Sequence, residues 1–299
     1  MKINTAKPSI YRLPALLVLF CSLTLSSYSS PKLDSLQSGG FRIRTVVVDA
    51  GHGGKDPGAF GPTTNEKTVT LALALKLQKA IEKELPEINV IMTRTTDNFV
   101  ELHKRADIAN EKQGQLFISL HCNSLANRRS TEVVGYKNGR HGKKIPIYKT
   151  VSTPNRSAKG AMILVYGSRR VGAQEEALRE NAVIFAEKDY KSNYAGYDPE
   201  NPASVILLNT FRDKYRKQSI RLATLIDTEF TDTDGRYSAG VKEQVVLVLD
   251  HTAMPSVLIE TGFINNPEDE DYLTSDEGQA EMVNSIVRAL KNYKKQVEN

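Results

Sequence analysis

The sequence predicts a single α/β domain with a mostly parallel central sheet flanked by helices. Short apolar runs of the kind found in buried strands alternate with longer stretches of helical spacing. Turn-forming residues follow several of the runs, most densely in the loop DAGHGGKDPGAFGPTTNEK. The 299 residues, 40% of them hydrophobic, suffice for a sizeable core and contain no internal repeat.

The first half of this domain shows the alternation most clearly. Strands are expected at 44–50, 88–94 and 115–121, and helices at 67–85 and 100–112. The first helix places an apolar residue at every fourth position from Val69 to Ile81, which gives it one buried face. Strands that alternate with helices favour parallel pairing, with ligands bound beyond the carboxyl ends of the strands.

The second half is less regular. Strands are expected at 131–136, 161–167, 243–249 and 255–261, and helices at 172–188, 203–230 and 269–296. The basic segment 137–160, which contains prolines and glycines, separates the first two of these strands. Residues 172–202 combine a helical stretch with a polar loop and are interpreted as an internal insertion in a catalytic domain that spans 44–299.

The N-terminus has the pattern of an export signal. Lys2, Lys7 and Arg12 precede the short apolar run LPALLVLFCSLTL, and the small polar run SSYSS follows it. This order is typical of a secretory signal peptide at 1–29, followed by a linker at 30–43, and it predicts a periplasmic or secreted protein. An uncleaved anchor, or a lipid attached to Cys21, is the alternative, although the bulky Phe20 disfavours the lipid.

Composition limits the partners. Cys122 would be the only thiol of the mature chain, so no internal disulfide is expected. The net charge of +5 suits an anionic partner, but the basic residues form no dense tract along the sequence, so nucleic acid is not expected as a partner. We expect a monomer, because no exposed apolar stripe stands out.

Three residues at strand and helix ends predict a metal site. His52 follows the first strand, Glu66 opens the next helix, and His121 ends the third strand. Because these positions share one edge of the sheet, the side chains form a set of three ligands, the number that catalytic zinc sites use. The alternative is that the histidines are ordinary hydrogen-bonded core residues.

A carboxylate stands at a fourth strand end. Glu260 closes the apolar run SVLIE, and a buried acid beside a metal can move protons during hydrolysis. The alternative is a structural role for Glu260, as a salt-bridged or helix-capping residue.

These segments resemble a known family. DAGHGGKDPGAFG with NEK, MTRTTDNFVELHKRADIANEK, LFISLHCNS and PSVLIETGFINNPEDE occur in the order and spacing of the zinc-dependent N-acetylmuramoyl-L-alanine amidases of bacterial cell walls. The resemblance spans roughly residues 44–299 and is weakest in the middle. It implies a zinc-exopeptidase-like architecture and a hydrolase that cuts the amide bond between the lactyl group of N-acetylmuramic acid and the L-alanine of the peptidoglycan stem.

The resemblance also implies residue roles. His52, Glu66 and His121 would hold Zn²⁺, and Glu260 would be the catalytic acid and base. Asn123 would contact the substrate, with capping of the next turn as its alternative. Asp49 is expected either behind the zinc ligands or in a strand-end turn, and Arg105 is expected to fix a loop. Cys122, where the family has a smaller residue, is interpreted as a buried packing residue.

The insertion resembles a regulatory element. Its stretch RENA, Arg179 to Ala182, is similar to insertions that cover the zinc in division-type members until an activator protein displaces them. Glu180 is therefore predicted to fill the open coordination position, and the alternative is a solvated surface helix. The implied role is remodelling of peptidoglycan during daughter-cell separation; the rival functions are a zinc exopeptidase on free peptides and a non-catalytic wall-binding division protein.

Overall fold

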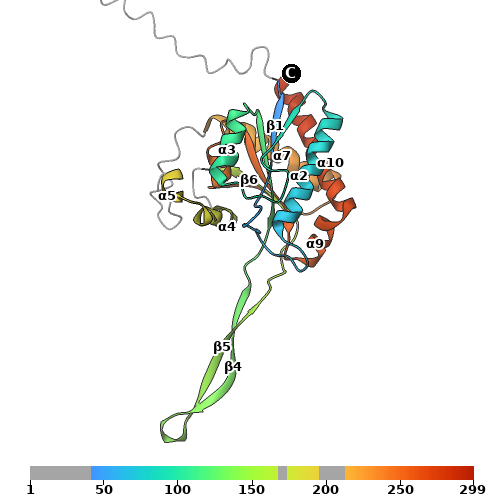
Figure 1. Cartoon of the computed structure of the whole chain (residues 1–299). Helices are drawn as coiled ribbons and strands as arrows, with labels where there is room; N and C mark the ends of the chain where they lie inside the picture. The colour runs from blue at the N-terminus through green and yellow to red at the C-terminus, as the bar shows by residue number, and fades with distance from the viewer. Residues whose placement is uncertain (1–41, 168–173, 195–212) are drawn as a thin grey trace, which may run out of the picture. The chain divides into compact units, whose positions relative to one another are not determined.

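The computed structural model describes residues 42–167, 174–194 and 213–299 (Figure 1). The predicted signal peptide at 1–29, nearly all of the linker at 30–43 and parts of the predicted insertion lie outside these ranges. Among the described residues, no helix combines the length and apolarity needed to cross a membrane.

A six-stranded sheet forms the centre of the fold. Its strands are β1 (Thr45–Ala50), β2 (Asn89–Met92), β3 (Leu116–Asn123), β6 (Ala161–Tyr166), β7 (Ser238–Gln244) and β8 (Ser256–Phe263). They lie in the order β2-β1-β3-β8-β6-β7, and every neighbouring pair is parallel except β6 and β8. The prediction of a mostly parallel sheet is therefore confirmed, and β1, β3 and β8 end at a common edge.

Helices cover both faces of the sheet (Figure 1). The helices are α2 (Glu66–Glu84), α3 (Leu102–Glu111), α4 (Glu175–Asn181), α5 (Tyr190–Asn193), α7 (Asp213–Thr228), α8 (Leu247–Asp250), α9 (Pro267–Thr274) and α10 (Asp276–Glu298). Val46 and Val48 of β1 pack into the core with α2, α7 and α10, whereas Val47 points to the other face, which α3, α4 and α8 cover. The alternation of side chains along buried strands thus divides the apolar residues between two cores.

Two expected elements differ from the structure. The run 243–249 was expected to be one strand, but β7 ends at Gln244 and Leu247–Asp250 forms α8. Its apolar residues are buried throughout, so their sequence does not distinguish a strand from a helix. The closing helix at 269–296 is in fact two helices, because Ser275 has an extended backbone and its hydroxyl accepts the Gly278 N–H, which starts α10.

The segment around 131–136 is longer than predicted. β4 (Arg128–Asn138) pairs with β5 (Lys144–Thr153), a strand that the sequence did not predict, in an antiparallel hairpin. This two-stranded sheet is separate from the central one and projects from it (Figure 1). We call residues 128–153 the hairpin.

The described part of the insertion is compact. α4 is shorter than the helix expected at 172–188, since a 3₁₀ turn (Ala182–Ala186) follows it and Glu187 lies beyond both. Ala177 and Ile184 are buried in the same core as α3 and α8. The described residues of the insertion therefore pack against the domain and do not form the predicted alternative of a solvated helix.

Candidate metal centre

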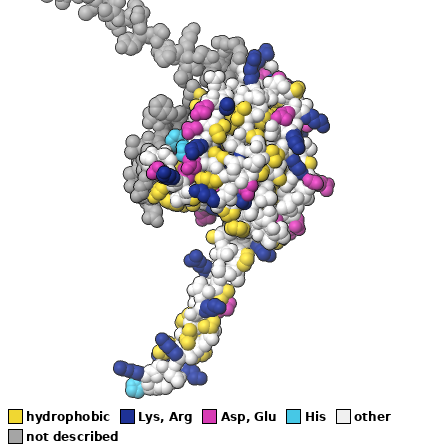
Figure 2. Space-filling view, in the orientation of Figure 1, with side chains coloured by type: hydrophobic (Ala, Val, Ile, Leu, Met, Phe, Trp, Pro, Cys, Tyr) yellow, Lys and Arg dark blue, Asp and Glu magenta, His cyan; other side chains and the backbone are white. Residues whose placement is uncertain are grey.

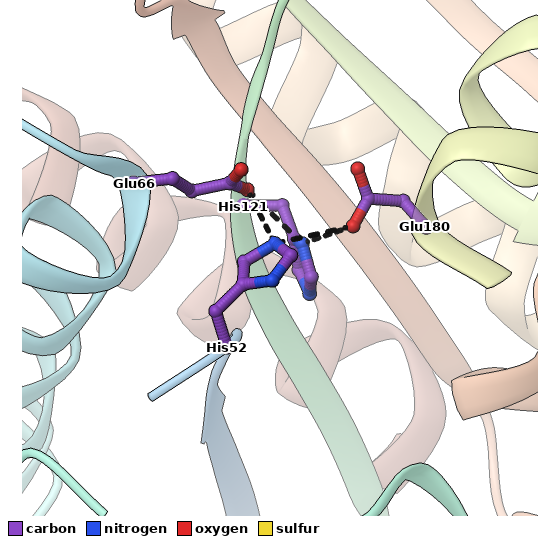
Figure 3. A group of neighbouring side chains, drawn as sticks. All are labelled: His52, Glu66, His121 and Glu180. Atoms are coloured by element: carbon purple, nitrogen blue, oxygen red, sulfur yellow. Dashed lines mark ion pairs between the residues drawn. The ribbon is translucent and has the colours of Figure 1, made fainter. Parts of the chain in front are cut away.

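Elements from four parts of the chain meet beyond the ends of β1 and β3. His52 lies just past β1, Glu66 is the first residue of α2, His121 lies in β3, and Glu180 lies in α4 of the insertion (Figure 3). All four side chains are buried, and one possible ligand atom from each lies within 4.8 Å of the others. The three predicted ligand residues are thus brought together, and so is Glu180.

The ligand atoms of this cluster converge on one point (Figure 3). Glu66 Oε1 is 3.0 Å from His52 Nε2 and 3.2 Å from His121 Nδ1. Glu180 Oε2 is 3.4 Å from His52 Nε2 and 2.7 Å from His121 Nδ1. Nevertheless His52 Nε2, His121 Nδ1 and Glu180 Oε2 have no hydrogen-bond partner among the described residues, because the atoms do not point along donor–acceptor lines.

A cation fits this donor set. Buried polar atoms without partners are costly, and two nitrogens with two carboxylate oxygens are a ligand combination that Zn²⁺ accepts. The electrostatics agree: burial lowers the pKa of His121, but the Glu180 and Glu66 carboxylates raise it to about 9. These two carboxylates therefore stabilise positive charge at this point, as they would for a bound cation.

The glycine loop allows the side chains to meet. A Cβ at Gly51 would lie 2.5 Å from His121 Nε2. At Gly58, which has a φ of 65°, a Cβ would lie 2.6 Å from Glu66 Oε2 and 2.7 Å from His52 Cδ2. Larger residues at these positions would push the ligands apart, which is why this loop is rich in glycine.

Hydrogen bonds hold two of the predicted ligands, His52 and Glu66, in place. The Asp56 carboxylate is 2.7 Å from His52 Nδ1, so Nε2 is the ring nitrogen that faces the cluster. The two oxygens of Glu66 accept the backbone N–H groups of Cys122 and Ala59, each at 2.8 Å. The side chains of His52 and Glu66 are therefore each fixed by a hydrogen-bonded neighbour.

Glu260 lies beside the cluster. It pairs in register with His121 on the adjacent strand β8, and alternation places both side chains on the face covered by α4. Burial raises the pKa of Glu260 to about 8, against the opposing effect of the Arg179 guanidinium. Its Oε1 accepts Arg179 Nη2 at 2.8 Å, and its Oε2 has no partner among the described residues.

Arg179 connects the insertion to this site. Besides Glu260, its guanidinium bonds the neighbouring Glu180 Oε1 at 3.0 Å, Asn123 Oδ1 at 2.7 Å and the Ser124 carbonyl at 3.1 Å. Two consecutive residues of α4 thus reach the site: Glu180 lies in the ligand cluster, and Arg179 binds the neighbouring carboxylate of Glu260. We call Arg179 and Glu180 the α4 pair.

The contacts of Asn123 are compatible with both of its interpretations, a cap of the next turn and a contact to the substrate. Its Oδ1 accepts the Ser124 N–H at 2.7 Å, which is a local turn contact. Its Nδ2 is buried and has no partner among the described residues. The amide nitrogen is therefore available to a carbonyl group of a bound substrate.

Asp49 and Arg105 form the support beneath the His52 loop. Arg105 Nη1 lies 2.7 Å from Asp49 Oδ1 and bonds the Ala50 carbonyl at 2.7 Å, and its Nη2 bonds the His52 carbonyl at 2.7 Å. The hydroxyls of Thr93 and Ser119 also donate to Asp49, each at 2.6 Å. The loop-fixing role predicted for Arg105 is confirmed, and Asp49 anchors the end of β1 without touching the ligands.

Cys122 faces away from the cluster. It is fully buried, packs in the core with α2 and α10, and its Sγ is 3.5 Å from Thr261 Oγ1. Burial raises the pKa of this thiol well above its ordinary value, which keeps it protonated. Its prediction as a packing residue is confirmed.

Sequence reasoning missed Asp56 and Arg179. A carboxylate four residues after His52 in the same loop is a signal that could have identified Asp56. No local signal identifies Arg179, because its partners lie 56 and 81 positions away.

The comparisons with known proteins agree with this geometry. The family model described as N-acetylmuramoyl-L-alanine amidase matches residues 46–292. N-acetylmuramoyl-L-alanine amidase AmiA of Escherichia coli (strain K12) is 27% identical over 271 residues, which cover 90% of this chain and 81% of that protein. The amidase AmiC of Neisseria meningitidis serogroup B is 25% identical over 292 residues, 94% of this chain and 62% of that protein.

Solved structures share the fold. An N-acetylmuramoyl-L-alanine amidase from Clostridium difficile 630 has a TM-score of 0.56 at 22% identity and covers 85% of this chain and 97% of its own. The CwlD amidase from Clostridioides difficile, solved in complex with the GerS lipoprotein, has a TM-score of 0.53 at 21% identity over 85% and 99% of the two chains. Since the family model matches most of this chain, the protein belongs to the N-acetylmuramoyl-L-alanine amidase family.

Proposed function

We propose that this amidase cuts peptidoglycan with one Zn²⁺ held by His52, Glu66 and His121, with Glu260 as the general base and acid. The bond cut is the amide between the lactyl group of N-acetylmuramic acid and the L-alanine of the stem peptide. The observation that carries the proposal is the convergence of buried, unpartnered ligand atoms 3.0–3.2 Å from one oxygen of Glu66.

The chemistry divides between the ion and the protein. When bound, Zn²⁺ polarises a carbonyl group and lowers the pKa of coordinated water towards about 7. Glu260 supplies the proton transfers: its unpaired Oε2 accepts a proton from the attacking water, and the same carboxyl then donates it to the departing alanine nitrogen. The free Nδ2 of Asn123 would donate a hydrogen bond to the substrate.

Glu180 and Arg179 would keep this site inactive. Glu180 Oε2 is 2.7 Å from His121 Nδ1, where it would serve as a fourth ligand in place of water. Arg179 holds the oxygen of Glu260 that faces α4, 2.8 Å away. A substrate therefore needs the α4 pair to move out of the site.

An activator protein that draws α4 away is the partner that such a site requires. The solved complex of the CwlD amidase with a lipoprotein gives a precedent for a bound protein partner in this fold. The resting state must be favoured by only a few kcal/mol, because a partner can shift an equilibrium only by its own difference in affinity for the two states.

The substrate also sets the location of the enzyme. Peptidoglycan lies outside the cytoplasmic membrane, which supports the prediction that residues 1–29 are an export signal and that the mature protein is periplasmic or secreted. A role in daughter-cell separation stays a prediction.

The decisive test is incubation of purified peptidoglycan with the mature protein, with and without a chelator. We expect stem peptides with a free L-alanine amine, and we expect the chelator to abolish them and added Zn²⁺ to restore them. His52→Ala or His121→Ala should lose both bound zinc and activity. Full zinc occupancy in either variant, measured by elemental analysis, would overturn the ligand assignment.

A further inference from the structure

We propose that the hairpin is a second, non-catalytic binding surface that holds anionic peptidoglycan through the carboxylates of its stem peptides. This inference rests on peptidoglycan as the substrate, and it assigns a role to an element that the catalytic proposal does not use. The hairpin would bind the peptidoglycan polymer next to the disaccharide-peptide unit that is being cut.

The charge of the hairpin is the first observation. Residues 128–153 contain one acid, Glu132, and the seven cations Arg128, Arg129, Lys137, Arg140, Lys143, Lys144 and Lys149. This net +6 exceeds the +5 of the whole chain, so the remaining residues together are slightly negative. The cations are exposed and spread from the base to the tip (Figure 2). None of them forms an ion pair within the described parts of the chain, so they are available to an anionic ligand.

The side chains between these cations are apolar and exposed. The opposed pair Val133 and Tyr148 and the neighbouring Tyr136 lie on one face, with the two tyrosines 63% and 62% exposed. Ile145 and Ile147 are 40% and 44% exposed. A two-stranded ribbon with uncovered apolar residues is marginal in water, which indicates that a ligand covers it in its working state. Flat tyrosine rings flanked by cations suit a polymer of sugar rings whose stem peptides carry carboxylates.

The base of the hairpin is fastened to the catalytic edge. The chain enters the hairpin at Arg128, after the short connection 124–127 that follows Asn123 of β3. Asn265, just after β8, bonds the Leu125 backbone on one side of the base and the Asn155 carbonyl on the other, and Asn266 bonds the Arg156 and Ala158 carbonyls. The hairpin is thus fixed to the strands that carry His121 and Glu260, where a polymer leaving the site would pass.

Other occupants fit less well. A second copy of the hairpin would bring six further positive charges against the first. A lipid bilayer would receive apolar residues at the tip, but the turn at Arg140–Gly142 is flanked by lysines and the apolar side chains lie further back along the strands. An extended polymer with regularly spaced carboxylates matches cations that are distributed along the whole ribbon.

The test is cosedimentation with purified sacculi. Full-length mature protein carrying Glu260→Gln is used so that the sacculi stay intact, and binding needs no turnover, so failure here leaves the proposed hydrolysis untouched. The hairpin variant is Arg129→Glu/Lys137→Glu/Lys144→Glu, in which no new acid faces Glu132. The matched control, Lys79→Glu/Lys217→Glu/Lys295→Glu, makes the same charge change on exposed residues of α2, α7 and α10.

We expect the hairpin variant to bind sacculi about tenfold or more weakly, and the control to bind like the parent. Capping the sacculus carboxylates as amides, or adding salt, should weaken the parent in the same way. Tyr136→Ser/Tyr148→Ser should also weaken binding, with unchanged zinc content and circular dichroism as evidence of folding. Equal binding by the hairpin variant and the control would overturn the proposal. So would hairpin-dependent binding to anionic phospholipid vesicles or duplex DNA that sacculi do not reproduce.

Discussion

At the scale of single residues, Glu260 combines burial with an incomplete set of partners. One of its oxygens is held by Arg179 and the other is unpartnered within the described structure. Such a carboxylate suits proton transfer, since its neutral and charged forms are both accessible near neutral pH when burial raises the pKa to about 8.

Replacement of Glu260 should therefore separate metal binding from chemistry. Glu260→Gln keeps the size of the side chain but cannot accept a proton, so zinc content should stay and turnover should fall by roughly 10²–10⁴-fold. Release of free L-alanine amines from peptidoglycan measures turnover. Glu66→Gln is the comparison variant and should weaken zinc binding itself. Near-normal turnover of Glu260→Gln would mean that another residue is the base.

Asp49 is the residue whose loss should affect stability. Burial raises its pKa, but Arg105 and the hydroxyls of Ser119 and Thr93 outweigh that effect and lower it below 3.8. Breaking a buried ion pair costs about 3–5 kcal/mol, because the partner charge stays buried. Asp49→Asn should therefore lower the free energy of unfolding by about 3 kcal/mol at pH 7.

The pH dependence of that loss has a definite sign. A carboxylate with a lowered pKa stabilises the fold above its unfolded pKa, and the contribution disappears as the pH falls through the folded value. The difference between wild type and Asp49→Asn in urea unfolding should thus shrink below about pH 4. Asp107→Asn, an exposed change on α3, is the control and should stay within about 0.5 kcal/mol of wild type. A loss at Asp49 as small as this would contradict its anchoring role.

The position of each site residue in the fold explains whether the sequence could predict it. His52, His121 and Glu260 lie at or near the carboxyl ends of parallel strands, and Glu66 starts the following helix, so the sheet topology alone brings them together. Arg179 could not be predicted, since its contacts depend on how a distant insertion packs. Glu180 was predicted from a resemblance of RENA to other insertions, not from spacing.

At the scale of elements, α4 is held by contacts on both sides of the site. Asn181 bonds the Val245 carbonyl and the Leu247 N–H, at 2.7 and 2.8 Å. Beyond the 3₁₀ turn, Glu187 accepts the Leu102 N–H at 2.8 Å and the Tyr194 hydroxyl at 2.6 Å. Deletion of 172–201 would remove these contacts and uncover the core, so substitutions of the α4 pair are the cleaner test.

Substitution of the α4 pair should raise basal activity. Arg179→Ala frees Glu260, Glu180→Ala frees the fourth position beside the histidines, and the double variant should be the most active on peptidoglycan without any partner. Glu175→Ala removes an exposed carboxylate from the same helix and should leave the rate unchanged. If the double variant binds zinc, melts like wild type and is no faster than Glu175→Ala, then α4 does not inhibit the enzyme.

The elements that sequence reasoning missed share a physical cause. Helix α8 lies in a fully buried apolar run, where no alternation of exposed and buried positions distinguishes a helix from a strand. Strand β5 is mostly exposed, mixes apolar with charged and hydroxyl residues and has a proline at position 146, so it lacks the pattern of a core strand. It forms because it pairs with β4, and this pairing is not visible in its own residues.

At the scale of the whole molecule, the metal site joins segments that are far apart in the chain. Its side chains come from the loop after β1, from α2, from β3 and from α4 of the insertion. A bound ion would therefore connect these four elements. A ligand that binds only the folded state stabilises it by roughly 2.7 kcal/mol when its concentration is 100 times its Kd.

Zinc should therefore raise the melting temperature, and Glu180 should account for part of that increase. For a domain of this size, about 3 kcal/mol corresponds to a shift of roughly 6–12 °C between zinc-loaded and chelated protein. In Glu180→Ala the ion keeps three protein ligands but no longer ties α4 to the sheet, so the shift should be smaller, whereas Glu175→Ala should show the full shift. Differential scanning calorimetry of the three proteins, each with zinc and with chelator, measures this. An equal shift in all three would mean that Glu180 does not bind the ion and that the insertion rests on the site through Arg179 alone.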